Sequence, residues 1–168
     1  MTRIAQAIDE VHRRTPNIGA RITLETTAGQ GTCLGHRFEH LGTIIDRVEQ
    51  PDRLGICVDT CHIFAAGYRF ETLAEYDATI EELDRAVGVD RVKVWHINDS
   101  VRERGSRVDR HAGIGRGKIG LEPFGHLVND PRFAAVPLIL ETPKGIDDAT
   151  GVDLDAVYVD LLRGLFSS

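Results

Sequence analysis

The sequence has few cysteines and no long apolar run. Its 168 residues include 3 cysteines, an odd number that cannot form a complete set of disulfides, and none belongs to a CxxC pair. No stretch of about 18 apolar residues is present, and the N-terminus carries no charged-then-apolar targeting segment. We therefore expect a chain that works in the reducing cytoplasm and has no membrane partner.

An overall excess of basic residues is also missing. The chain has 20 Lys and Arg against 26 Asp and Glu, a net charge of −6, whereas phosphate binding usually leaves a basic footprint. This average conceals one basic segment, residues 102–118, which carries +4 and leaves −10 for the rest of the chain. The segment fits either a solvated loop or a surface that binds phosphates.

No complete nucleotide-binding motif is present. The string GQG at 29–31 lacks the third glycine of a dinucleotide fingerprint and the GK[ST] of a P-loop. An open doubly wound domain, which would need such a loop early, is therefore the less favoured architecture. A tight turn that uses the backbone freedom of glycine explains the string.

Apolar periodicity divides the chain into alternating helices and strands. Strands are predicted over about 21–26, 54–60, 92–98 and 136–142, and helical stripes at 4–11, 38–48, 73–87, 121–129 and 154–162. This alternation predicts an α/β fold with a parallel sheet and right-handed crossovers. A complete (β/α)8 TIM barrel needs about 250 residues. We therefore interpret residues 1–168 as a single partial domain, the C-terminal half of such a barrel with four βα units.

The candidate metal ligands follow the strands. Near the C-terminal end of each strand stands one of Glu25, Asp59, His96 and Glu141. His62 is expected in the loop after the second strand, and an extended loop would place Asp109 and His111 on one side. Barrels collect functional residues at this end of their strands. Carboxylates mixed with imidazoles favour zinc, manganese or iron over magnesium or calcium.

The other histidines and two strand residues are expected to serve the structure. We place four histidines on helical segments, where surface or packing roles are favoured: His12, His36, His40 and His126. Cys57 shares strand parity with Asp59 and is expected to be a small core residue. Trp95 alternates with His96, so it should face the helices and not stack on a base.

Three strings carry a resemblance to a known family. They are GICVDTCH at 55–62, WHINDS at 95–100 and GSRVDRH at 105–111. They resemble signature motifs of the endonuclease IV family of apurinic/apyrimidinic endonucleases. Supporting strings are ETTAGQG at 25–31, FEH at 38–40 and LILET at 138–142, so the resemblance covers about residues 22–142. It implies a (β/α)8 barrel of the xylose-isomerase-like superfamily, three zinc ions, and a DNA-repair enzyme that cleaves the phosphodiester 5′ to abasic sites in DNA.

The resemblance also assigns roles to residues. It makes Glu25 the carboxylate that bridges two metals, and it gives the second metal three further ligands, Asp59, His96 and Glu141. The third metal receives a complete set from His62, Asp109 and His111.

Further roles follow from the same resemblance. Glu25 and Glu141 are expected to be catalytic, and Arg107 and Arg110 to contact DNA. The two histidines that complete the first metal site in the family have no counterpart, and Val101 stands where the family motif has lysine. Two complete zinc sites and an impaired activity are therefore expected.

Two other functions fit the residues. A half-barrel would expose two strand edges and an apolar inner face, so the chain would be a noncatalytic metal-binding module that needs a missing N-terminal half or self-association. A metal-dependent sugar isomerase or epimerase of the same superfamily would also use Glu, Asp and His at strand ends. Such an enzyme would not need His62, Asp109 and His111 for a two-metal site.

Overall fold

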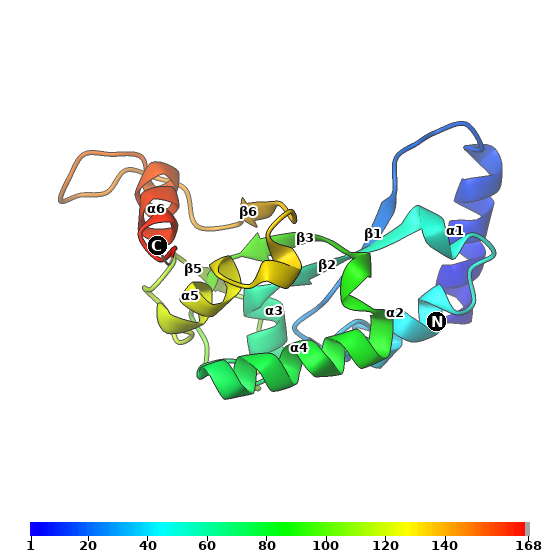
Figure 1. Cartoon of the computed structure of the whole chain (residues 1–168), viewed down its shortest axis with the longest axis horizontal. Helices are drawn as coiled ribbons and strands as arrows, with labels where there is room; N and C mark the ends of the chain where they lie inside the picture. The colour runs from blue at the N-terminus through cyan, green and yellow to red at the C-terminus, as the bar shows by residue number, and fades with distance from the viewer. Residues whose placement is uncertain (167–168) are drawn as a thin grey trace.

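A four-stranded parallel sheet forms the centre of the molecule (Figure 1). The computed structural model describes residues 1–166. The strands are β1 (Ile22–Glu25), β2 (Leu54–Asp59), β3 (Val92–Ile97) and β6 (Leu138–Leu140), in the order β1-β2-β3-β6. Each lies inside one of the four predicted ranges. The predicted α/β class with a parallel sheet is thus confirmed.

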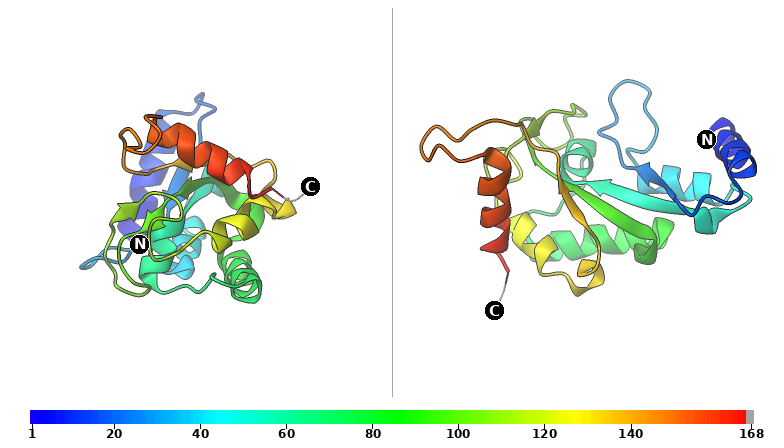
Figure 2. Two further views of the ribbon diagram at one scale, coloured as in Figure 1. Left: turned by 90° about the vertical axis from the view of Figure 1, so that its left-hand side faces the viewer. Right: turned by 90° about the horizontal axis from the view of Figure 1, so that it is seen from above.

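Helices cover one face of this sheet. Five were expected from the sequence: α1 (Thr2–Arg14), α2 (Phe38–Ile45), α4 (Leu73–Val87), α5 (Glu122–Val128) and α6 (Leu154–Arg163). Three short 3-10 turns span Pro51–Arg53, Val89–Arg91 and Pro131–Phe133. α2, α4 and α5 lie along one side of the sheet, while α1 and α6 stand at opposite ends of the molecule (Figures 1 and 2).

One short helix and one pair of short strands were not predicted. Helix α3 (Thr60–Ala66) starts directly at the end of β2, so His62 lies in its first turn and not in a loop as expected. The two-residue strands β4 (Asp99–Ser100) and β5 (His111–Ala112) form an antiparallel pair. This pairing closes the basic loop between them into a hairpin and fixes the position of His111.

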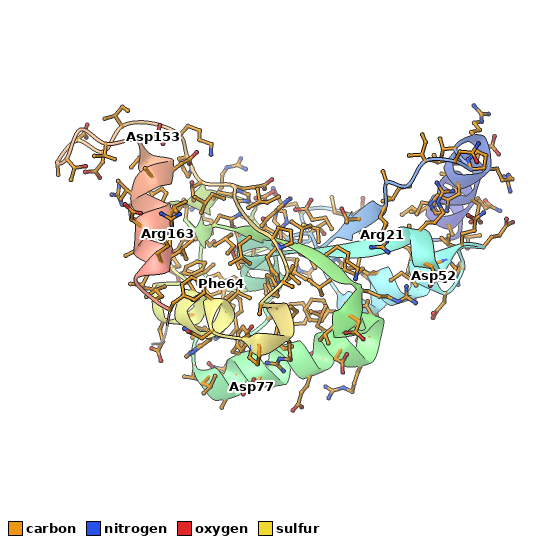
Figure 3. The ribbon with its side chains drawn as sticks, turned by 45° about the horizontal axis from the view of Figure 1, so that its top comes forward. Arg21, Asp52, Phe64, Asp77, Asp153 and Arg163 are labelled. Atoms are coloured by element: carbon orange, nitrogen blue, oxygen red, sulfur yellow. The ribbon has the colours of Figure 1, made fainter. Side chains whose placement is uncertain are left out.

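The hydrophobic core lies between the sheet and the helices. β2 is buried at all six positions, as expected for a central strand of a parallel sheet. Trp95 is 1% exposed and meets Phe133 edge to face with ring centroids 5.2 Å apart, so it faces the helices as predicted. Phe64 of α3 also points into the layer between the sheet and the helices (Figure 3), and its ring centroid lies 6.0 Å from that of Phe70. Helix α4 begins with a capping box between Thr72 and Glu75, which satisfies its first backbone N–H groups.

No helix within residues 1–166 covers the opposite face of the sheet (Figure 2). A side chain at Gly55 would touch Thr23 and Lys93, so these three positions share this face. Thr23 and Lys93 are exposed, and Ile139 on β6 is 48% exposed. The uncovered face therefore carries exposed polar residues on β1 and β3 and an exposed apolar residue on β6. Among the described residues, β1 and β6 each pair with a strand on one side only.

The six α-helices of the described chain have between 7 and 15 residues each. None of those within residues 1–166 is long and apolar enough to cross a membrane.

Candidate metal centre

Four side chains converge at the C-terminal end of the sheet. His96 Nδ1 lies 3.0 Å from Glu25 Oε1 and 3.3 Å from Glu141 Oε1. Together with Asp59 these residues each offer one ligand atom, and the four atoms lie within 4.8 Å of one another. We call them the strand-end group. Parallel strands are about 4.8 Å apart, so a flat sheet would separate β1 from β6 by about 14 Å. The convergence shows that the sheet is curved like part of a barrel wall.

A second set of ligands lies beside the first. His62 Nε2 is 3.1 Å from Asp109 Oδ2, and His111 Nε2 is 3.1 Å from Asp109 Oδ1. The rings of His62 and His111 have centroids 5.5 Å apart. We call these three residues the hairpin group, because Asp109 and His111 belong to the hairpin that β4 and β5 close. Asp59 adjoins this group as well, since its carboxylate offers an oxygen within 4.8 Å of a nitrogen of each imidazole.

Backbone carbonyls fix the orientation of both imidazoles in the hairpin group. His62 Nδ1 lies 2.8 Å from the carbonyl oxygen of Thr26, and His111 Nδ1 lies 2.9 Å from that of Glu141. A carbonyl oxygen only accepts hydrogen bonds, so each Nδ1 carries a hydrogen and each Nε2 is left facing Asp109, where it would bind a metal ion once it carries no proton. Metal-binding histidines are typically oriented in this way.

One nitrogen at the centre of the site has no hydrogen bond. His111 Nε2 is buried, and it makes no hydrogen bond within residues 1–166 although Asp109 Oδ1 is at ion-pair distance. A buried polar atom without a partner costs free energy unless it binds something else. Because this atom faces a carboxylate and another imidazole, the donor set fits a divalent cation such as Zn²⁺.

The charges of the site also favour a cation. Burial disfavours a charged His62 ring, but Glu25, Asp59 and Asp109 outweigh burial and raise the pKa of His62 to about 9. Burial also acts on the Glu25 carboxyl, yet contacts with His62 and His96 hold its pKa below the usual value. The field that keeps a proton on His62 would equally stabilise a metal ion, which releases that proton when it binds.

Asp59 is the most enclosed of the seven candidate ligands. Its side chain is completely buried, and burial raises the pKa of its carboxyl against the opposing effect of His62, Asn98 and His111. Asp59 Oδ1 accepts the backbone N–H of His62 at 2.8 Å, which also caps helix α3. Asp59 Oδ2 accepts the side-chain amide of Asn98 at 2.8 Å. By contrast, the Glu25 and Glu141 side chains are 36% and 38% exposed, so solvent reaches them.

Two buried thiols adjoin the site, each within 4.8 Å of two candidate ligands: Cys57 beside Glu25 and His96, and Cys61 beside Asp109 and His111. Burial raises the pKa of Cys57 to about 12 and that of Cys61 to about 11, so both are protonated at neutral pH. Cys57 is a core residue, as predicted. The thiol of Cys61 instead donates to the carbonyl oxygen of Arg110 at 3.7 Å, which ties α3 to the hairpin.

The basic segment divides into paired and unpaired side chains. Three of its members form ion pairs: Arg104 with Glu71, Arg116 with Asp147, and Lys118 with Glu103. Within residues 1–166, Arg102, Arg107 and Arg110 have no ion pair with a carboxylate. Arg107 is the one described non-glycine residue with a positive φ, 54°, and its N–H is held by the carbonyl of Ala65 at 2.9 Å. Both Arg107 and Arg110, the expected DNA contacts, belong to the hairpin loop between β4 and β5.

The remaining histidines lie outside the metal groups found within residues 1–166. His12 is buried on α1, and His40 accepts the N–H of Gly35. His36 contacts the carbonyl of Cys33 from a loop, so the expectation that it lies on a helix is wrong. His36 lies in the bend that directly precedes α2, outside the helix.

Sequence reasoning missed the residues that hold the ligands. Thr26 accepts the N–H of Asp59 through its hydroxyl, and Gln30 accepts the N–H of Asp109. Asn98 and Asp99 stood in a quoted motif, but the motif did not distinguish their roles. Asp99 is buried and its carboxylate accepts backbone N–H groups from Ser100, Gly117 and Ile119, so it shapes the loop after the hairpin.

Known proteins are similar to this chain in sequence and in fold. The family described as xylose isomerase-like TIM barrel matches residues 1–162. A protein named Probable endonuclease 4 from Chloroflexus aggregans is 55% identical over 165 residues, which are 98% of this chain and 56% of that protein. Endonuclease IV from Thermus thermophilus matches with a TM-score of 0.81 and 36% identity, over 97% of this chain and 56% of that one.

A more distant structure matches in fold alone. A D-tagatose 3-epimerase-like protein has a TM-score of 0.64 at 22% identity, and the match covers 95% of this chain and 53% of that one. The chain thus spans about half the length of the relatives it matches. With the resemblance to endonuclease IV confirmed by these relatives, the chain belongs to the xylose isomerase-like TIM barrel family.

Proposed function

We propose that the chain is the metal-binding half of a zinc-dependent DNA-repair endonuclease that cleaves the phosphodiester 5′ to abasic sites. The observation that carries this proposal is the convergence of all seven candidate ligands in two adjoining groups. The names and similarity of the endonuclease 4 relatives support it. Three free cysteines and a DNA substrate agree with the cytoplasmic location expected from the sequence.

Each group would hold one zinc ion. The strand-end group offers Glu25, Asp59, His96 and Glu141, and the hairpin group offers His62, Asp109 and His111. Bound zinc would supply Lewis-acid stabilisation of the phosphate and a water molecule that ionises near neutral pH.

The residues of the chain would contribute in distinct ways. Glu25 and Glu141 are the carboxylates of the strand-end group that reach solvent, so they are placed to accept a proton from a water molecule at the phosphate. Arg107 and Arg110 lack carboxylate partners within residues 1–166, and Arg110 Nη1 donates only to the backbone carbonyl oxygen of Asp109 at 2.6 Å. Their positive charges are therefore not neutralised and would bind phosphates that flank the cleaved bond. Asp59 is too buried to meet a substrate, so its role would be to hold metal.

The activity would depend on a partner for the sheet. β1 and β6 carry or precede two of the ligands, Glu25 and Glu141, and both strands have an open edge in the described chain. The relatives are almost twice as long as this chain. We infer that a complementary half-barrel pairs with these edges and supplies the histidines of the first metal site. A second copy of this chain would cover the edges without supplying those histidines. The chain alone would then be impaired in cleavage.

The test compares the chain alone with a completed barrel. The remaining part of the Chloroflexus aggregans relative would be supplied as a separate polypeptide, and cleavage of abasic duplex DNA would be compared with that of intact duplex. We expect zinc to bind the chain alone, and cleavage 5′ to the abasic site to appear only with the partner. Failure to bind zinc would overturn the metal assignment, and full cleavage by the isolated chain would overturn the need for a first metal site.

The same measurements separate the two other functions. A sugar isomerase or epimerase would convert a ketose even when the hairpin group is removed by substitution. The similarity to the epimerase-like protein concerns the fold alone. A noncatalytic module would bind zinc and gain no cleavage with the partner. The contacts of Asp109 with His62 and His111 favour the nuclease over the isomerase or epimerase, while the gain of cleavage with the partner separates it from the noncatalytic module.

A further inference from the structure

We propose that Asn98 is a positioning residue that fixes the rotation of the Asp59 carboxylate and thereby sets the affinity of the metal centre. This inference rests on the proposed function, because it assumes that Asp59 binds metal. Asn98 follows β3 directly, and both residues are completely buried. Neither can exchange its partner for water.

The contact between the two side chains is direct. Asn98 Nδ2 donates to Asp59 Oδ2 at 2.8 Å, while the N–H of His62 donates to Asp59 Oδ1 at 2.8 Å. Each carboxylate oxygen thus accepts one hydrogen bond and keeps a lone pair for a metal. Because the two bonds act on opposite oxygens, the carboxylate cannot rotate about its last bond without losing one of them.

The surroundings of Asn98 leave one orientation for its amide. Asn98 Oδ1 accepts the N–H of Cys61 at 3.1 Å, so the amide nitrogen must face Asp59. The backbone of Asn98 is held on both sides by Thr60, whose hydroxyl donates to the carbonyl at 2.6 Å and accepts the N–H at 3.0 Å. The donor that meets Asp59 is therefore rigid.

Asn98 differs from the other groups that hold ligands. Thr26 and Glu141 orient His62 and His111 through backbone carbonyls, which no substitution removes. Gln30 contacts the backbone N–H of Asp109 and leaves its carboxylate free. Among the described residues other than the ligands, only Asn98 donates a side-chain hydrogen bond to a ligand carboxylate.

The position of Asp59 makes this one bond matter for both groups. Asp59 offers a ligand atom to the group of Glu25, His96 and Glu141, and it also offers one to the group of His62 and His111. Hydrogen bonds to metal ligands of this kind typically change metal affinity by about 10- to 100-fold. We expect the loss of the Asn98 amide to lower the Zn²⁺ affinity of the strand-end group by a factor of that order.

The experiment measures metal binding and not cleavage. Zn²⁺ affinity of the full chain would be measured by competition with a chromophoric chelator, and Co²⁺ would be bound in its place so that its visible spectrum reports the ligand geometry. The variants are Asn98→Ala and Asn98→Ser, of which the second leaves a small polar group should the first not fold. Tyr76→Phe is the control, because it removes another buried hydrogen bond to a carboxylate, Tyr76 Oη to Asp130 Oδ2 at 2.9 Å, away from the metal groups.

The outcomes separate positioning from mere stability. We expect both Asn98 variants to lose about 10- to 100-fold in Zn²⁺ affinity and to change the Co²⁺ spectrum, while Tyr76→Phe unfolds more easily but binds Zn²⁺ and Co²⁺ as the parent does. A folded Asn98 variant with the parent's affinity and spectrum would overturn this inference and leave the proposed function intact. A parent chain that binds neither ion would overturn the proposed function itself.

Discussion

His96 on β3 lies 3.0 Å from the carboxylate of Glu25 on β1, although β2 runs between the two strands. In a flat sheet the two backbones would be about 10 Å apart. The contact therefore depends on the curvature of the sheet and on the length of both side chains. Residues 71 positions apart in the sequence meet at one site because each stands at the C-terminal end of its strand.

Substitution of the hairpin ligands should remove one metal ion and leave another. In Asp109→Ala and in His111→Ala, the hairpin group loses a ligand that is 3.1 Å from its neighbour, whereas the strand-end group keeps all four of its members. Elemental analysis of the purified chain should show one zinc ion fewer per chain than in the parent.

The matched control for these variants is His36→Ala, which removes an imidazole outside the described metal groups. It should keep the zinc content of the parent. Loss of every ion in Asp109→Ala would contradict two separable groups and indicate a single shared site.

The unpaired arginines should contribute to DNA affinity through phosphate contacts. For a double variant Arg107→Gln and Arg110→Gln, we expect weaker binding of abasic duplex by the completed barrel. The slope of log affinity against log salt should be smaller by about 1.8, since each phosphate contact contributes about 0.9. Fluorescence anisotropy at several salt concentrations measures this slope.

Arg116→Gln provides the control for the arginine variants. Arg116 belongs to the same basic segment, but Asp147 holds its guanidinium at 2.7 Å. It should change the salt slope little. If Arg116→Gln lowered the salt slope as much per residue as the substitutions of Arg107 and Arg110, DNA affinity would depend on the net charge of the segment. It would then not depend on which arginines lack a carboxylate partner.

The sequence was sufficient to predict the strands because each combines an apolar run with a polar residue at its end. It could not predict α3, because this helix has only seven residues and six of them are buried. The sequence therefore shows no periodic alternation of apolar and polar residues there. Nor could it predict the pair β4 and β5, whose two-residue strands depend on tertiary contacts. As a result, the spacing of the ligands in the sequence did not predict that His62 lies in a helical turn. It also did not predict that Asp59 lies between the two groups.

The close packing of α2 on α4 should not tolerate a larger residue at Gly42. A methyl group there would overlap the backbone carbonyl oxygen of Ala86, and a helix backbone cannot move aside as a flexible side chain does. We expect Gly42→Ala to lower the free energy of unfolding by about 1–3 kcal/mol, as overpacking typically does. Urea denaturation followed by circular dichroism measures this change. Gly125→Ala is the control, because its added methyl group meets no atom within 4 Å.

The carboxyl of Asp130 should make stability depend on pH at the acidic end. Burial acts to raise its pKa, but hydrogen bonds from Arg132 and Tyr76 outweigh burial and hold the pKa below the usual value. The stabilising effect of the Asp130 carboxylate is thus present above its pKa in the unfolded chain, about 3.9. It is lost as the pH falls through the lower pKa of the folded chain.

At pH 7, Asp130→Asn should lower the free energy of unfolding by about 1–3 kcal/mol, because a buried hydrogen bond to a charged partner is weakened. Urea unfolding between pH 7 and pH 3 should show the difference from the parent shrinking below about pH 4, whereas Asp148→Asn, an exposed carboxyl, should match the parent throughout. A difference that stays constant down to pH 3 would mean that Asp130 acts through shape and not through its charge.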